Sequence, residues 1–315
     1  MGIDISVIIP TYNEEGNVEL LCNELKTVLS SLKLNFEIIF IDDCSTDTTN
    51  QRLLALHTND PTVKIIKFRK NFGQSAAMKA GFEHSQGRLI ISMDADLQND
   101  PLDIPPMIEK IEKENFDVVC GWRYNRQDSA QKKIFSKLAN RIRSFLTGET
   151  IHDSGCTLRV YKREAIRDLE LNGELHRYIP AMLLWKGYQI GEIKSNHRQR
   201  VSGKSKYNWK RLTKGFLDLL VIAFWQKYSV RPMHIFGGSG LLIGFIGLVI
   251  TAYLILEKLL LGMALAERPL FLVGILFIIV GVQFIAIGLL ADIMLKVYYS
   301  QNQRKSYLIE KITEK

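Results

Sequence analysis

The stretch SVIIPTYNEE (residues 6–15) begins as a run of apolar β-branched residues and ends in polar and acidic ones. Such a run favours a strand, here Ser6–Pro10, followed by a loop. Beyond the loop, apolar side chains recur at intervals of three and four, which predicts one buried face of a helix. These side chains are Val18, Leu21, Leu25, Val28, Leu29 and Leu32. The N-terminus therefore predicts a strand followed by a packed helix.

Short apolar runs continue along the chain and alternate with amphipathic helical patterns. The further candidate strands are Glu37–Ile41, Val63–Phe68, Leu89–Met93 and Asp117–Gly121. This alternation is typical of an α/β fold with a mostly parallel sheet and helices on both faces. After residue 122 we expect a basic helical stretch, Gln131–Leu146, a short strand, Thr157–Tyr161, and further helix from Arg163.

Polar loops follow four of the predicted strands, at residues 11–15, 42–47, 69–73 and 94–98. Open parallel sheets bind ligands beyond the carboxyl ends of their strands. We therefore expect the four loops to line one crevice.

Two acidic residues in the last of these loops are candidate metal ligands. Asp94 and Asp96 lie two positions apart, so an extended turn directs both carboxylates the same way, and Gln98 offers a further oxygen. Oxygen ligands of this kind suit Mg²⁺ or Mn²⁺ on a diphosphate. The alternative is that these aspartates only cap a turn or helix.

The second and third loops carry candidate nucleotide contacts. Asp42 and Asp43 are placed to accept hydrogen bonds from a base or ribose, although Asp43, Ser45 or Thr46 as a cap of the following helix explains the same pattern. Residues 71–74 form a glycine turn that opens a helix, and its amides suit a phosphate or base. A simple turn and cap explains residues 71–74 as well.

Two long uncharged segments lie in the last third of the chain, Ile235–Leu256 and Pro269–Ala291. Each is about 22 residues long, or roughly 33 Å as a helix, which is enough to cross a bilayer. The alternative is a pair of buried core helices. Basic residues outnumber acidic ones on the outer flanks, which predicts that both termini are cytosolic. Glycines 237, 238, 240, 244 and 247 predict close helix packing within or between subunits.

The predicted organisation has four parts: a catalytic head at 1–206, interfacial amphipathic helices at 207–231, two transmembrane helices at 232–295 and a basic tail at 296–315. In the second part, tryptophan and phenylalanine alternate with lysine and arginine, which suits a helix in the membrane interface.

The formal net charge of +8 favours an anionic partner. Much of the excess lies between Arg123 and Arg231, directly before the apolar segments, which suits lipid phosphates and anionic membrane lipids better than nucleic acid. The four cysteines form no CxxC pair, so they indicate neither a disulfide framework nor a zinc site.

Four ordered motifs resemble those of family 2 glycosyltransferases with the GT-A fold, in particular the dolichyl- or polyprenyl-phosphate hexosyltransferase branch. The motifs are residues 7–15, 41–47, 71–73 and 93–98. The resemblance extends over nearly the whole chain and implies an α/β GT-A head on a membrane base.

The resemblance also implies roles for single residues. It places Pro10, Tyr12, Glu14, Asp42, Asp94, Ala95, Asp96 and Arg123 on the nucleotide sugar, with Ala95 as a passive spacer. Asp94, Asp96 and Gln98 would hold the metal, Mg²⁺ or Mn²⁺. Lys132, Ser136 and Arg200 would bind the acceptor phosphate. Asp153, within residues 153–156, resembles the acidic motif near the reacting centre and is the third candidate catalytic residue beside Asp94 and Asp96.

The predicted reaction is an inverting transfer of a hexose from a nucleotide-diphosphate sugar, UDP-glucose first and GDP-mannose next, to polyprenyl phosphate. A phosphate monoester has a second pKa near ~6, so the acceptor is already anionic at neutral pH and needs little base catalysis. We expect a cytosolic head at the cell membrane and a homo-oligomer, with a tetramer as one candidate state.

Two alternatives remain at this point. One is a processive polysaccharide synthase or another membrane glycosyltransferase, such as a protein-directed one, on the same fold. Against the synthase, the chain has only two predicted spans and no QxxRW motif. A non-catalytic membrane scaffold or lipid-transport component is disfavoured by the intact Asp94, Asp96 and Gln98.

Overall fold

A computed structural model describes residues 2–124, 144, 148–167, 169–171, 173–198, 224, 232–262, 264–265 and 268–301. The chain divides into two compact units, Met1–Ile222 and Ala223–Lys315, which we describe separately. The predicted helical stretch Gln131–Leu146 and the predicted interfacial helices at 207–231 lie outside the described residues, apart from Ser144 and Phe224.

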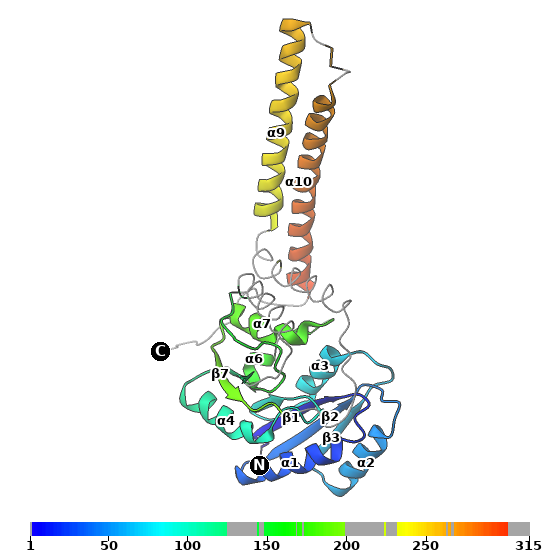
Figure 1. The fold of residues 1–315 in the computed structure, drawn as a ribbon, viewed down its shortest axis with the longest axis vertical. Coiled ribbons are helices and arrows are strands. Elements are labelled where there is room, and N and C mark those ends of the chain that lie inside the picture. The colour runs from blue at the N-terminus through cyan, green and yellow to red at the C-terminus, as the bar shows by residue number, and fades with distance from the viewer. Residues whose placement is uncertain are drawn as a thin grey trace. The chain divides into compact units, whose positions relative to one another are not determined.

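The first unit is a seven-stranded sheet with helices on both faces (Figure 1). Its elements are β1 (Ile5–Thr11), α1 (Val18–Ser31), β2 (Phe36–Asp42), α2 (Thr49–Asn59), β3 (Val63–Lys67), α3 (Gln74–His84), β4 (Leu89–Ser92), η1 (Pro101–Asp103), α4 (Ile104–Lys113), β5 (Val118–Arg123), β6 (Arg159–Lys162), α6 (Arg163–Ile166), η2 (Leu175–Tyr178), α7 (Ile179–Trp185) and β7 (Ile190–Ser195). The predicted α/β class is confirmed, and the strand order is β3-β2-β1-β4-β6-β5-β7.

All five strands predicted for the first 121 residues are present, with ends that differ by one or two residues. The sixth, predicted at Thr157–Tyr161, is β6, which pairs antiparallel with both β4 and β5. The sequence analysis missed the edge strand β7, because its residues, IGEIKS, mix glycine with charged side chains. Its strand conformation is stabilised by parallel pairing with β5.

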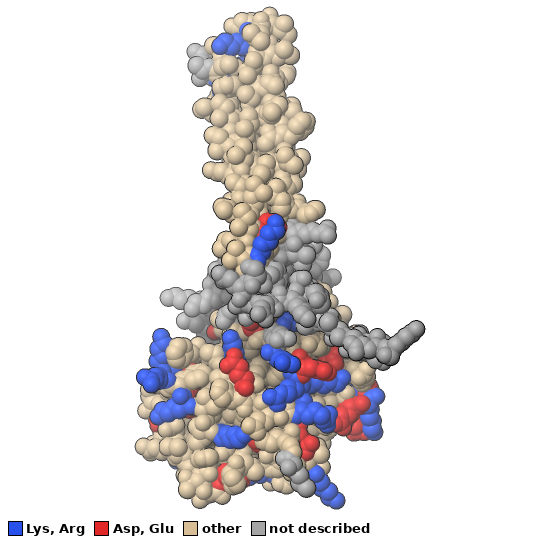
Figure 2. Space-filling view, turned by 180° about the vertical axis from the view of Figure 1, so that it is seen from behind, with Lys and Arg blue, Asp and Glu red and all other residues tan. Residues whose placement is uncertain are grey.

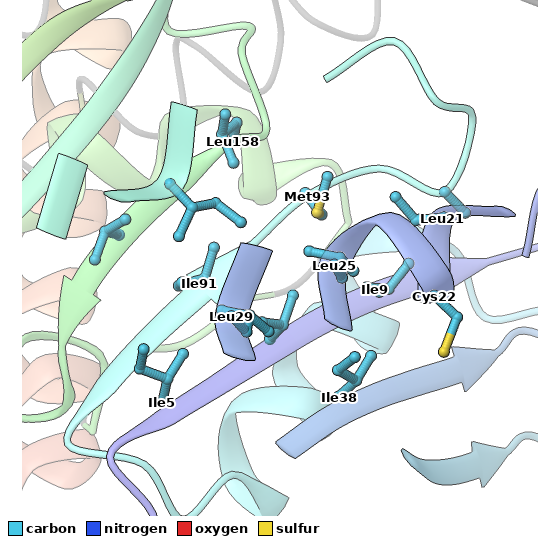
Figure 3. Close-up of a cluster of buried hydrophobic side chains, with 14 of the residues drawn as sticks. Ile5, Ile9, Leu21, Cys22, Leu25, Leu29, Ile38, Ile91, Met93 and Leu158 are labelled. Atoms are coloured by element: carbon cyan, nitrogen blue, oxygen red, sulfur yellow. The ribbon is translucent and has the colours of Figure 1, made fainter. Parts of the chain in front are cut away.

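The helices bury one apolar cluster on each face of the sheet. Helices α1, α2 and α4 cover one face, and α3, α6 and α7 cover the other. Figure 3 shows Leu25 and Leu29 of α1 beside Ile5 and Ile9 of β1, with Met93 in the same cluster. Met93 is 1% exposed. Since Asp94 follows directly, the hydrophobic core fixes the point from which the acidic loop begins.

The second unit contains two long helices, α9 (Pro232–Leu261) and α10 (Pro269–Gln301). Both are long and apolar enough to cross a membrane, with mean hydropathies of 2.3 and 2.9. Only 17% and 11% of their most apolar windows are buried, which is unlike a core helix of a soluble protein. Most of their visible surface is free of charged side chains (Figure 2).

Glycines bring α9 and α10 into backbone contact. A Cβ atom added at Gly240 would lie 2.6 Å from the carbonyl oxygen of Gly281, and one added at Gly247 would lie 2.6 Å from that of Gly274. Gly238, in contrast, has no neighbouring atom within 4 Å of such a position. Gly240 and Gly247 therefore serve packing within this helix pair, as small residues do in membrane helices.

Candidate active site

A cavity of about 290 Å³ opens at the carboxyl ends of the parallel strands. Its walls come from the segments after β1, β2 and β4 and from the first turns of α3. The lining residues are Pro10, Thr11, Tyr12, Glu14, Asp43, Gln74, Ala77, Asp94, Ala95 and Asp96. The structure thus brings together five of the predicted nucleotide-sugar residues from two loops, Pro10, Tyr12, Glu14, Asp94 and Asp96, as well as the spacer Ala95.

The loop after β1 is locked to the loop after β2 by reciprocal hydrogen bonds. The backbone N–H of Asn13 donates to Ser45 Oγ at 3.0 Å, and the backbone N–H of Thr46 donates back to Asn13 Oδ1 at 2.8 Å. Asn13 has a φ of 56°, a left-handed conformation that asparagine tolerates. The backbone N–H of Glu14 also donates to Thr49 Oγ1 at 2.8 Å. These bonds fix the backbone on both sides of Tyr12 and Glu14.

The two aspartates after β2 have different surroundings. Asp43 lines the cavity, and its carboxylate accepts the backbone N–H groups of Phe72 at 2.7 Å and Gly73 at 2.9 Å. Asp42 is fully buried and does not line the cavity. Its Oδ1 accepts the N–H of Ser45 at 2.9 Å, while Oδ2 has no partner among the described residues.

The expectation that Asp43, Ser45 or Thr46 caps the helix after β2 is wrong. That helix, α2, begins after Thr48, and Asp47 Oδ1 accepts the N–H of Thr49 at 3.0 Å. Asp43 instead holds the residues that precede α3. Gly73, with a φ of 90°, makes the turn into α3, a conformation that glycine adopts without strain.

Asp94 and Asp96 both face the cavity, and Asp96 is only 7% exposed. Gln74 Nε2 donates to Asp94 Oδ1 at 2.7 Å. Burial, with the charge of Asp96 as the next cause, raises the pKa of Asp94 above its ordinary value. Two neighbouring carboxylates in a partly buried site provide the oxygen donors and the negative potential that a divalent cation requires. Their chemistry therefore fits the metal that the sequence predicts.

Gln98, the third predicted metal ligand, does not line the cavity. Its backbone N–H donates to Asp96 Oδ1 at 3.2 Å, and its carbonyl accepts the N–H of Arg198 at 2.9 Å. Leu97 between them is 3% exposed and has a φ of 61°, which is unusual for a leucine. This turn ties the acidic loop to the segment that follows β7.

Arg123 and Asp153 form a bidentate ion pair, and neither lines the cavity. Burial alone would lower the pKa of Arg123, but the hydrogen bonds and charge of Asp153 outweigh burial and raise that pKa. The charge of Asp94 contributes in the same direction. A Cβ atom at Gly155 would lie 3.1 Å from Arg123 Nη2, so the residues after Asp153 pass close to the guanidinium. Arg123 thus links the two acidic segments electrostatically.

Three predicted acceptor-binding residues, Lys132, Ser136 and Arg200, lie outside the described residues.

Sequence reasoning missed two residues at the acidic pair. Gln74 was noted only as part of a glycine turn, but its side chain contacts Asp94. Thr157 also acts on Asp94 and lowers its pKa against the effect of burial, although it lies 63 positions further along the chain. An amide or hydroxyl with these roles carries no local sequence signal, because each contact joins segments that are separated in the chain and meet only in the folded head.

A mostly parallel sheet with an aspartate pair in a cavity at its carboxyl edge defines, with the motifs above, a glycosyltransferase of the GT-A type. The model for the family described as "Glycosyl transferase family 2" matches residues 6–170. The chain belongs to this family.

Two relatives match almost the full length of the chain. A dodecaprenyl-phosphate galacturonate synthase of Rhizobium johnstonii is 38% identical over 99% of this chain and 93% of its own. An undecaprenyl-phosphate 4-deoxy-4-formamido-L-arabinose transferase of Klebsiella pneumoniae is 35% identical over 98% and 93%. Among solved structures, glucosyl-3-phosphoglycerate synthase from Mycobacterium tuberculosis with Mn²⁺ and UDP-glucose has a TM-score of 0.52 at 18% identity, over 71% of this chain and 79% of that one. That likeness supports the fold.

Proposed function

We propose that this glycosyltransferase moves a sugar from a nucleotide-diphosphate donor to a polyprenyl phosphate. The observation that carries the proposal is the near full-length similarity to two enzymes that are both named for a polyprenyl phosphate. The two long apolar helices support it, because a membrane-held acceptor requires an enzyme at the bilayer.

Asp94 and Asp96 are proposed to hold a divalent cation, Mg²⁺ or Mn²⁺. When bound, the cation would neutralise charge on the departing nucleoside diphosphate. Among the described residues, no cluster of three or more His, Cys, Asp or Glu side chains is arranged to hold a metal ion. The remaining ligands would therefore be donor phosphate oxygens, water or Gln98.

The cavity walls are proposed to bind the donor, with Pro10, Tyr12 and Glu14 from one loop and Ala95 beside the metal ligands. Asp42 is fully buried, so its carboxylate would act on the nucleotide from behind the residues that line the cavity. Lys132, Ser136 and Arg200 remain proposed ligands of the acceptor phosphate.

The anionic acceptor oxygen is proposed to attack the anomeric carbon as the nucleoside diphosphate leaves, which inverts the configuration at that carbon. Asp153 is engaged by Arg123 through two hydrogen bonds, at 2.6 and 2.9 Å. A carboxylate held in this way is suited to orientation rather than to proton removal. The acceptor requires no base, since a phosphate monoester is largely ionised at neutral pH.

The identity of the transferred sugar is inferred from the relatives rather than from residues of the cavity. The sequence analysis favoured a hexose from UDP-glucose, with GDP-mannose next. The two relatives are instead named for galacturonate and 4-deoxy-4-formamido-L-arabinose. We therefore rank donors of a uronic acid and of a formamido-pentose ahead of UDP-glucose and GDP-mannose.

We also propose that α9 and α10 both cross the cell membrane and that the head, at 1–206, faces the cytosol with both termini. The basic flanks that the sequence places outside the two spans support this orientation. The same proposal includes an interfacial segment at 207–231, a basic tail at 296–315, contacts with anionic lipids and a homo-oligomeric state.

One experiment tests the activity directly. Purified full-length protein in nanodiscs is incubated with Mg²⁺ or Mn²⁺, polyprenyl phosphate and a panel of nucleotide sugars that contains all four donors, and any glycolipid is identified by mass. We expect one polyprenyl-phosphate sugar, formed by the wild type and lost in Asp96→Asn. If no donor yields a product while the protein binds both metal and lipid, the proposal fails.

A further inference from the structure

A buried arginine lies outside the cavity that forms the candidate site. Arg159 of β6 is 1% exposed and is among the largest fully buried side chains of the head. Among the described residues it makes no ion pair with a carboxylate. A buried guanidinium without a counter-charge is unfavourable for stability unless its donors are satisfied. Its Nη1 and Nη2 make hydrogen bonds, whereas Nε has no partner among the described residues.

Arg159 donates to two backbone carbonyls from different segments. Nη2 donates to the carbonyl of Ser154 at 2.5 Å, and Nη1 donates to the carbonyl of His176 at 3.1 Å. Ser154 directly follows Asp153, whereas His176 belongs to η2. The planar fork of an arginine holds two acceptors at a fixed spacing, which a lysine does not.

The contact with His176 continues to the helix that carries Gln74. His176 is 5% exposed, and its backbone N–H donates to Ser75 Oγ at 3.2 Å. The same hydroxyl shares a 2.8 Å hydrogen bond with His176 Nδ1. Ser75 is the second residue of α3, next to Gln74, whose amide donates to Asp94.

Both ends of this chain of contacts lie at the acidic groups of the site. At one end, the side-chain amide of Gln74 donates to Asp94. At the other end, Arg159 binds the carbonyl of Ser154, the residue after Asp153. We infer that Arg159 is a positioning residue which, with His176 and Ser75, sets the spacing between the segment that bears Asp153 and the helix end that supports Asp94. This inference deepens the proposed function, because it names residues that act on the same site without touching substrate.

The first test measures amide hydrogen exchange of the full-length protein without substrate, so it does not depend on the proposed reaction. Ser75→Ala removes the hydroxyl that His176 contacts, and alanine is well tolerated in a helix. We expect faster exchange in peptides that cover residues 153–158, which Ser75 does not touch. Ser85→Ala is the matched control, since Ser85 is equally buried, at 2%, at the other end of α3. The control should leave residues 153–158 unchanged.

Arg159→Lys is the second variant, and it should increase exchange both at 153–158 and around residue 176. If Arg159→Lys does not fold, Ser75→Ala still decides the question. Exchange changes that stay confined to the neighbourhood of Ser75 and His176 would overturn the inference.

The second test measures the rate of sugar transfer, with the nucleotide sugar that the wild type is shown to use. We expect Ser75→Ala to lower kcat roughly 10-fold at a temperature where the variant is fully folded, the size typical of residues that orient metal or substrate ligands. We also expect Ser75→Ala and Arg159→Lys to be non-additive when combined, because they interrupt the same chain of contacts. A lowered unfolding temperature with unchanged kcat, or additive effects, would show a purely structural role.

Discussion

Arg123 and Asp153 form a two-point ion pair in which Nε lies 2.6 Å from Oδ2 and Nη2 lies 2.9 Å from Oδ1. Both side chains are 15% exposed, so the pair is largely shielded from water. Such bidentate pairs fix orientation as well as charge. Because Arg123 also interacts with the charge of Asp94, the pair connects the acidic residue from the second half of the head with the proposed metal site.

Asp153→Asn should destabilise the head by about 3 kcal/mol, because Arg123 loses its counter-charge in a largely buried place. Urea unfolding measured by fluorescence tests this value. The double variant Arg123→Met, Asp153→Leu should recover part of the stability, since it leaves no unpaired charge, but it should not recover transfer activity. Equal stability of Asp153→Asn and the wild type would contradict the burial of the pair.

Asp94 should make the metal-free head less stable as the pH rises. Its pKa in the folded state is raised above its ordinary value of 3.8, so between these two pKa values the folded protein binds more protons than the unfolded protein. The stabilisation is therefore present below pH 3.8 and is lost as the pH rises through the folded-state pKa. The difference in unfolding temperature between the wild type and Asp94→Asn, measured in chelator, should therefore shift against the wild type as the pH rises through this window.

Added Mn²⁺ should reverse this loss of stability at neutral pH, because a cation bound by Asp94 and Asp96 favours the ionised form of Asp94. The unfolding temperature of the wild type should rise with Mn²⁺ and that of Asp94→Asn should rise much less. An identical response of the two proteins would place the cation elsewhere.

Gln74→Leu should weaken productive metal and donor binding. It removes the amide that donates to Asp94 Oδ1 and leaves that oxygen without this donor. Loss of a group that orients a metal ligand commonly reduces metal affinity or activity by roughly 10- to 100-fold. The Mn²⁺ concentration for half-maximal transfer measures the effect, and Gln86→Leu, on the loop after α3, is a control on a glutamine outside the cavity.

Gly281→Ala should destabilise the pair of apolar helices. The added methyl group would lie 2.6 Å from the carbonyl oxygen of Gly240, so the helices must separate. Inserting a methyl group into a close-packed contact costs about 1–3 kcal/mol. Gly238→Ala, with open space around the new methyl group, should be neutral or stabilising. Thermal unfolding in nanodiscs compares the two, and equal destabilisation would contradict the glycine contact.

Local sequence patterns were sufficient for much of the fold. The runs of apolar, mostly β-branched residues predicted β1 to β5, because such residues pack well on the surface of a sheet. Strand β7 was missed because its conformation depends on pairing with β5 rather than on its own residues.

The assignment of side chains to the cavity required the structure even where a motif was clear. Asp42 and Asp43 are adjacent, and successive side chains at a strand end point to opposite sides. The resemblance placed Asp42 on the nucleotide, whereas the structure buries Asp42 and turns Asp43 to the cavity wall. Of these two buried carboxylates, only that of Asp43 lines the cavity.

The sequence by itself determined the α/β head, the loop that carries Asp94 and Asp96, and the two apolar segments, because each depends on residues that are close together in the chain. Only the tertiary structure decided that Arg123 pairs with Asp153, that Gln74 and Thr157 support Asp94, and that Arg159 is buried beneath the site. These contacts join residues that are separated in the chain, so they form only when the strands and helices of the head have assembled.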